Sequence, residues 1–152
     1  MTERTSTAIE YEHPVALNVL TSFLKTGRLI DHASSAALIC SFIVTLQPVS
    51  WVTELGLLSA LILAIIEKYF AWRVTLDAEL FAVLAAHPQE TRTFDNALAT
   101  VLGRKINPPI RTMQSRWLGA KRLLRNQSIS FGLQIAVLIL IVVVQSDTLF
   151  GG

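Results

Sequence analysis

Glu67 is the residue whose type and position most strongly suggest chemistry. It follows an apolar stretch, residues 55–66, that contains no charged side chain. An ionisable group inside a membrane is costly, and it commonly handles a proton or cation or pairs with another helix. One interpretation is therefore an intramembrane polar site, in which Gln134 offers Glu67 a hydrogen bond. The other is that the carboxylate extends to the membrane surface, beside Lys68 and an interfacial Trp72.

No residue pattern typical of an active site or a metal site occurs in the sequence. The single cysteine, Cys40, lies in an apolar stretch, and the three histidines are far apart, so a metal site would need distant segments to converge. Asp31 and Ser34 are explained as caps of the helix that follows them. Glycine-rich phosphate loops and the HExxH and GxSxG motifs are missing. We therefore expect a non-enzymatic protein without cofactor or metal.

The basic residues are concentrated in the centre of the chain. Nine of the 13 lie between residues 73 and 125. A Lys or Arg near a membrane surface contributes about 1 kcal/mol to the attraction of anionic lipids. The candidate lipid contacts are Arg104, Lys105, Arg111, Arg116, Lys121, Arg122 and Arg125. Nucleic acid is the less favoured partner, because aromatic residues are not interleaved with the basic ones as in single-strand binders.

The composition indicates that membrane helices position these residues. The 152 residues are 52% hydrophobic and 16% charged, with a mean hydropathy of +0.51, whereas soluble domains are roughly 45–50% apolar and about 25% charged. The stretches without charged residues are 32–53, 55–66 and 126–146. The last is long enough for a spanning helix of about 20 residues. Pro48 interrupts the first stretch, so we expect one helix over 33–46 and a second from Val52 to Trp72.

The spacing of acidic residues in that second helix raises a difficulty. Glu54 and Glu67 are 13 residues apart, about 20 Å along a helix, whereas the hydrocarbon core is about 30 Å thick. Either one carboxylate enters the membrane or the bilayer is locally thinner. A re-entrant hairpin would place Glu54 at the membrane centre, at a cost of at least about 2.5 kcal/mol. We therefore expect the helix to cross.

The predicted fold is all-α: an integral membrane protein with three transmembrane helices, an N-terminal amphipathic helix and a helical loop between the second and third spans. The expected segments are a cytoplasmic N-terminal segment (1–32), a transmembrane hairpin (33–72), a basic helical cytoplasmic loop (73–127), a third transmembrane helix (128–146) and a short external tail (147–152). The N-terminal helix starts at Pro14 and ends before Gly27 as a C-cap. It rests on the membrane or packs on the protein's own loop.

The loop is expected to be mostly helical. The second spanning helix should continue past Trp72 as one rod of about 35 residues, roughly 50 Å long, until His87-Pro88 ends it. A short helix follows, with Thr93 as its N-cap and Gly103 at its C-terminal end. A basic helix begins after Pro108-Pro109 and runs into the third span.

The distribution of Lys and Arg predicts the orientation. The turn at 47–53 and the tail after Ser146 contain no basic residue. The positive-inside rule therefore places the N-terminus and the central loop in the cytoplasm, and the turn and the C-terminal tail outside. We expect a multi-pass protein of the inner or plasma membrane, if the source is bacterial.

Each predicted span carries small residues four apart, a spacing that lets helices approach closely. They are Ala33, Ala37 and Ser41; Gly56, Ala60 and Ala64; and Gly132 and Ala136. Either the three helices pack on one another, or they pack on a second copy or a larger membrane partner. Our leading hypothesis is a non-catalytic accessory or assembly subunit of a membrane complex or homo-oligomer. The alternative is a homo-oligomeric pore or an ion or proton pathway that uses Glu67.

Overall fold

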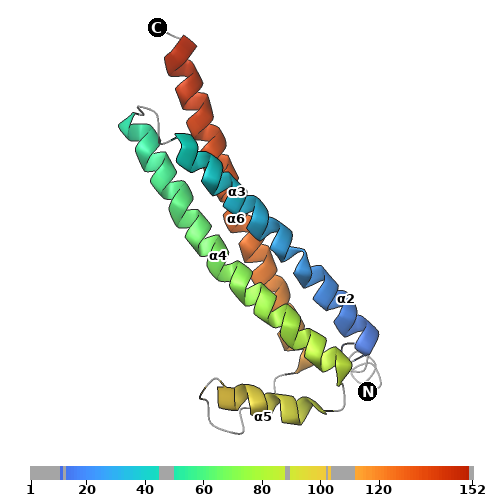
Figure 1. The fold of residues 1–152 in the computed structure, drawn as a ribbon. Helices are drawn as coiled ribbons and strands as arrows, with labels where there is room; N and C mark the ends of the chain where they lie inside the picture. Colours follow the sequence, from blue (N-terminus) through green and yellow to red (C-terminus); the bar gives the residue numbers. More distant parts are fainter. Residues whose placement is uncertain are drawn as a thin grey trace. The chain divides into compact units, whose positions relative to one another are not determined.

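The computed structural model describes residues 11, 13–44, 50–87, 90–101, 103 and 112–150, with side chains as far as residue 146. No strand occurs among these residues, so the described chain is all-helical, as predicted. Its helices are α2 (Pro14–Lys25), α3 (Gly27–Val44), α4 (Trp51–Ala86), α5 (Thr91–Val101) and α6 (Met113–Phe150) (Figure 1).

Short polar residues set several of the helix boundaries. Pro14 begins α2, where its missing N–H is not needed, and the Val15 N–H donates to His13 Nδ1 at 3.2 Å. Ser50 caps α4, because its Oγ accepts a hydrogen bond from the Thr53 N–H at 3.3 Å. Gly103 has a φ of 61°, in the left-handed region that glycine adopts without strain.

Both long helices are confirmed. α4 has 36 residues, and the basic helix runs without a break into the third apolar segment as α6, which has 38 residues. Two boundaries were predicted wrongly. α3 begins at Gly27 instead of Ala33, because the single residue Thr26 separates it from α2. The short helix begins at Thr91 and not after Thr93.

Two helices, α4 and α6, are long and apolar enough to cross a membrane. Only 22% of the most apolar stretch of each is buried, whereas the core helix of a soluble protein is mostly buried. This is weak support for a membrane location. The described part of α3 does not meet the same test, so the structure leaves the first predicted span, the helix over 33–46, unconfirmed.

The helices form two compact units, Met1–Lys25 with Val74–Arg122, and Thr26–Arg73 with Leu123–Gly152. α4 and α6 each contribute to both. In the first unit, leucines of α2 and the apolar end of α4 are buried. There Arg116 of α6 donates to Asp95 of α5 at 2.5 and 2.7 Å. Trp117 packs edge-on against Tyr11, and Lys121 Nζ lies 5.4 Å from the centroid of the Trp117 ring.

The second unit contains α3, the first part of α4 and the second part of α6, which lie side by side (Figure 1).

Buried positions recur every seven residues along both long helices. In α4 they are Thr53, Ala60, Glu67, Val74 and Phe81, and in α6 they are Met113, Ala120, Gln127, Gln134 and Ile141. A seven-residue interval is the repeat of helices that pack with a left-handed supercoil. Glu67 and the two glutamines therefore occupy packing positions.

Candidate functional site

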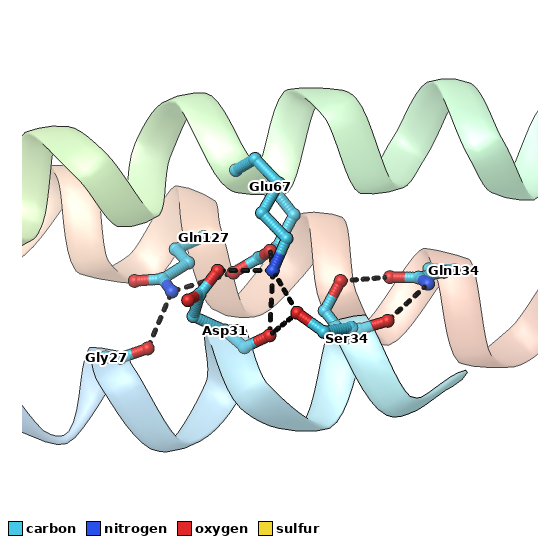
Figure 2. A network of polar contacts seen from close by, with 8 residues as sticks. Gly27, Asp31, Ser34, Glu67, Gln127 and Gln134 are labelled. Atoms are coloured by element: carbon cyan, nitrogen blue, oxygen red, sulfur yellow. Dashed lines mark hydrogen bonds and ion pairs between the residues drawn. The ribbon is translucent and has the colours of Figure 1, made fainter. Parts of the chain in front are cut away.

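Glu67 lies inside the second unit, in a polar network that joins α3, α4 and α6 (Figure 2). Its side chain has no solvent-exposed surface. Gln127 Nε2 donates one hydrogen bond to Glu67 Oε1 and another to the Gly27 carbonyl, both at 2.8 Å. An amide nitrogen has two hydrogens, so both are used. A single Gln127 side chain thus links all three helices at one level.

Lys68 extends from the same turn of α4 to α3. Its Nζ donates to the Asp31 carboxylate, to the Asp31 carbonyl at 2.8 Å and to Ser35 Oγ at 2.6 Å. The Lys68 and Asp31 side chains are 39% and 32% exposed. Lys68 Nζ also lies 3.7 Å from Glu67 Oε2, which is close enough for an ion pair but too far for a hydrogen bond. The ion pair therefore forms the half-exposed edge of a network whose centre is buried.

Gln134 pairs with Ser34 further along the same two helices. Ser34 Oγ donates to Gln134 Oε1 at 2.8 Å, and Gln134 Nε2 lies 3.3 Å from the Ser34 carbonyl that accepts its hydrogen bond. Both side chains are fully buried. The contacts show that α3 and α6 run in the same direction. Gly27 contacts Gln127, and seven residues further along both helices Ser34 contacts Gln134. Contacts of α4 with α6 run the opposite way, from Glu67 beside Gln127 to Gly56 beside Ile141.

Charge and hydrogen bonding in this network are not balanced. Two carboxylates, Asp31 and Glu67, face one ammonium group, Lys68, so the formal sum is one negative charge. Glu67 Oε2 and Gln127 Oε1 are buried and have no hydrogen-bond partner among the described residues. Buried oxygens without a donor are rare in native structures and call for a specific explanation. Both atoms are acceptors, so each of them lacks a hydrogen-bond donor.

The structure corrects the sequence interpretation of Glu67. The surface interpretation is wrong, because the side chain is fully buried between helices. Its glutamine partner is Gln127 and not Gln134, which is hydrogen-bonded to Ser34. Ser34 lies inside α3 and is therefore no cap. The signal that could have revealed Gln127 is its interval of seven residues from Gln134.

The small residues of α4 pack inside the unit. Ala60 and Ala64 are fully buried, and a Cβ on Gly56 would lie 2.8 Å from Ile141 Cγ1. Those of the other two helices are covered less. Ala37 and Ser41 are half-buried and Ala33 is exposed.

On α6, Gly132 and Ala136 are exposed, and a Cβ on Gly132 would meet no atom within 4 Å. The small residues of α4 therefore serve packing within one chain, whereas the small residues of α6 remain open in the structure.

The predicted lipid contacts have different environments. Arg104, Lys105 and Arg111 lie outside the described residues. Arg116 is occupied by Asp95, whereas Lys121, Arg122 and Arg125 are exposed. Arg116 is thus a structural residue, and three exposed cations on α6 remain as candidates.

Within the described ranges, no group of three or more His, Cys, Asp or Glu side chains could hold a metal ion. Cys40 is a free, exposed thiol. Comparison with protein families, with characterised proteins and with solved structures finds no match. The function must therefore be argued from the chain's own geometry.

Proposed function

We propose that this chain crosses a membrane three times and acts as a non-catalytic accessory or assembly subunit of a membrane complex or homo-oligomer. The observation that carries the membrane part is the inverted arrangement of the second unit. Polar Glu67, Gln127 and Gln134 are buried, whereas large apolar side chains point outward. The exposed ones include Ile39, Phe42, Leu58, Ile62, Ile65, Leu133, Ile139, Leu140 and Val142. A contiguous apolar exterior is unfavourable in water and favourable in lipid.

The tryptophans of α4 support a full crossing. Trp51 and Trp72 are 72% and 64% exposed, and their separation of 21 residues corresponds to about 31 Å along a helix. This matches a hydrocarbon core of about 30 Å, and tryptophan prefers both of its edges. The short distance from Glu54 to Glu67 is then no obstacle, because Glu67 faces other helices and not lipid.

α3 supports a third crossing through its partners. Its apolar run is short, but Asp31 is paired with Lys68 and Ser34 with Gln134. Polar groups in membrane helices are tolerated when they face the bundle and pair with one another. The proposed orientation rests on Arg28, Arg73 and Arg125. All three are exposed and lie within two residues of Gly27, Trp72 or Gln127. They mark one end of the unit, which the positive-inside rule assigns to the cytoplasm.

The subunit role rests on the uncovered small residues of α6. Gly132 and Ala136 form an open surface on which a helix of a second copy or of a larger membrane protein could pack closely. The test is the mass of the intact particle after purification in mild detergent. We expect a particle larger than one 16.8 kDa chain, and a lone monomer would contradict the proposal.

A matched pair of variants locates that contact. Gly132→Ile should dissociate the particle, because the branched side chain holds a neighbouring helix away. Gly119→Ile is the control: Gly119 is an α6 glycine whose Cβ position is equally empty, but it lies in the other unit. If both variants leave the mass unchanged, the Gly132 surface is not the contact.

A second candidate function is an ion or proton pathway that uses Glu67. The observation that favours it is the buried, unpartnered Glu67 Oε2. Because Glu67 lies between helices of one chain, such a pathway would pass through the unit and not between copies. Protein in sealed liposomes should then conduct protons or cations, and Glu67→Gln should change the rate. Liposomes that remain tight would exclude this function.

A further inference from the structure

We propose that Glu67 Oε2 binds a proton inside the second unit, and that this proton reaches it from the side of Asp31 and Lys68. The inference rests on the second candidate function and names its ligand as the proton. It starts from the hydrogens available around Oε2. Lys68 has three N–H donors, and all three are directed to α3. Gln127 has two, and both are used by Glu67 Oε1 and Gly27.

The five donor hydrogens of Lys68 and Gln127 are therefore committed to other acceptors. For Oε2 to accept a hydrogen, either one of these bonds must break or a hydrogen must enter the site from outside. A proton on Oε2 supplies it and also removes the excess negative charge of the network. A buried carboxylate is strongly unfavourable in apolar surroundings unless its charge is fully paired, and here Glu67 shares one ammonium group with Asp31. One added proton thus balances the formal charge of the network and supplies the hydrogen that Oε2 lacks.

A metal cation fits the site less well than a proton. Calcium and magnesium ions take about six or more oxygen ligands. Glu67 Oε1 and the Gly27 carbonyl already accept N–H groups, which leaves the two oxygens without partners, Glu67 Oε2 and Gln127 Oε1. In addition, the Lys68 ammonium lies 3.7 Å from Oε2 and would repel a cation there. A proton needs no ligand cage.

The half-exposed ion pair gives the proton a route. Asp31 and Lys68 are both about one-third exposed, and Lys68 Nζ is close to both carboxylates. In the transfer, an O–H bond of a hydronium ion breaks as the O–H bond of Oε2 forms, and the hydronium becomes water, while the three N–H groups of Lys68 keep their bonds to α3. The net reaction is protonation of Glu67 by hydronium, and release is the reverse.

The charged groups around Glu67 come from each packed helix. α4 contributes Lys68, and α3 contributes Asp31 through Lys68. α6 contributes the uncharged amide of Gln127. Arg125 of α6 and His32 of α3 are exposed. A proton on Glu67 would therefore change the charge balance of the trio formed by Glu67, Lys68 and Asp31.

The test is infrared difference spectroscopy of the whole protein in lipid during a pH titration. A protonated carboxylic acid has its own C=O stretching band, separate from those of carboxylates and amides. Among the acid bands that appear and disappear reversibly, we expect one that shifts with ¹³C-glutamate labelling and is missing in Glu67→Gln, while the bands of the other six glutamates remain. The labelling distinguishes a glutamate band from a band of Asp31, and it is done on the wild-type protein.

Glu54→Gln is the matched control, because Glu54 is an exposed glutamate of the same helix. It should leave the band unchanged. Gln127→Leu should raise the band frequency, because the C=O group loses the amide hydrogen bond. If wild-type protein shows no glutamate acid band while it remains folded, or if the band survives in Glu67→Gln, the site is refuted. If the Glu67 band is present and the liposomes do not conduct, the pathway is refuted but the proton-binding site is not.

Discussion

Replacing each buried glutamine of α6 by leucine should separate the energetics of the two hydrogen-bonded pairs. Gln127 and Gln134 lie on one helix, are seven residues apart, and are both fully buried. Each makes two hydrogen bonds to neighbouring helices, but only Gln127 bonds a carboxylate, that of Glu67. The same substitution at both positions therefore compares the loss of a charged partner with the loss of a neutral one.

The expected costs differ by about 1–3 kcal/mol. A hydrogen bond between membrane helices is worth about 0.6 kcal/mol on average and about 1.7 at most, so Gln134→Leu should cost about 1 kcal/mol. The Ser34 hydroxyl that it leaves can turn to a carbonyl of its own helix. Gln127→Leu leaves a buried carboxylate with neither oxygen bonded to a donor, and such loss costs about 1–3 kcal/mol or more. We expect about 2–4 kcal/mol in total.

The measurement is reversible unfolding in mixed detergent, followed by helical circular dichroism. The double variant Glu67→Leu/Gln127→Leu completes the cycle. It should be no less stable than Gln127→Leu alone, because replacing both members of a buried polar pair by apolar residues is often neutral or stabilising. Equal costs for the two glutamine variants, or strict additivity of Glu67→Leu and Gln127→Leu, would refute the reasoning.

Three further outcomes are expected. Gly56→Leu should destabilise the fold by about 1–3 kcal/mol through overpacking against Ile141, and Ile141→Ala should restore part of the loss; an unchanged unfolding midpoint would contradict the contact. Asp31→Asn should cost only about 0–1 kcal/mol in the same assay, because the half-exposed pair is screened by solvent, and a larger loss would show that the pair is effectively buried. Reporter proteins fused after Phe150 and inserted within 90–101 should lie on opposite sides of the membrane, and matching signals would overturn the three-span topology.

The continuous helices could be predicted from sequence because their signals are local. α4 and α6 are long runs of helix-compatible residues, and the sequence has Pro48 before the first run, Pro88 after it and Pro108-Pro109 before the second. Pro14 begins α2 for the same local reason. The boundary at Gly27 was missed because a glycine after a lysine is typical of a helix end. Here the chain turns only at Thr26 and begins α3 at once.

The network around Glu67 could not be predicted by searching for an apolar face. In a helix bundle surrounded by lipid, both the inner and the outer surface can be apolar, so there is little amphipathic contrast to show which side is buried. The buried stripe of α4 consists instead of small and polar residues such as Thr53, Ala60 and Glu67. A prediction that treats every charged residue as exposed therefore places Glu67 on the outer surface, whereas it is buried.

The seven-residue interval carries the missing information. Gly27 and Ser34 of α3 match Gln127 and Gln134 of α6 because seven residues make about two helical turns, so both pairs return to the same face. Hydrogen bonds depend on direction, whereas apolar contacts do not. A shift of α3 along α6 by one turn would therefore separate both pairs at once. We conclude that the polar residues select one register for three helices whose apolar surfaces would permit several, and that Glu67 has its position because that register holds it.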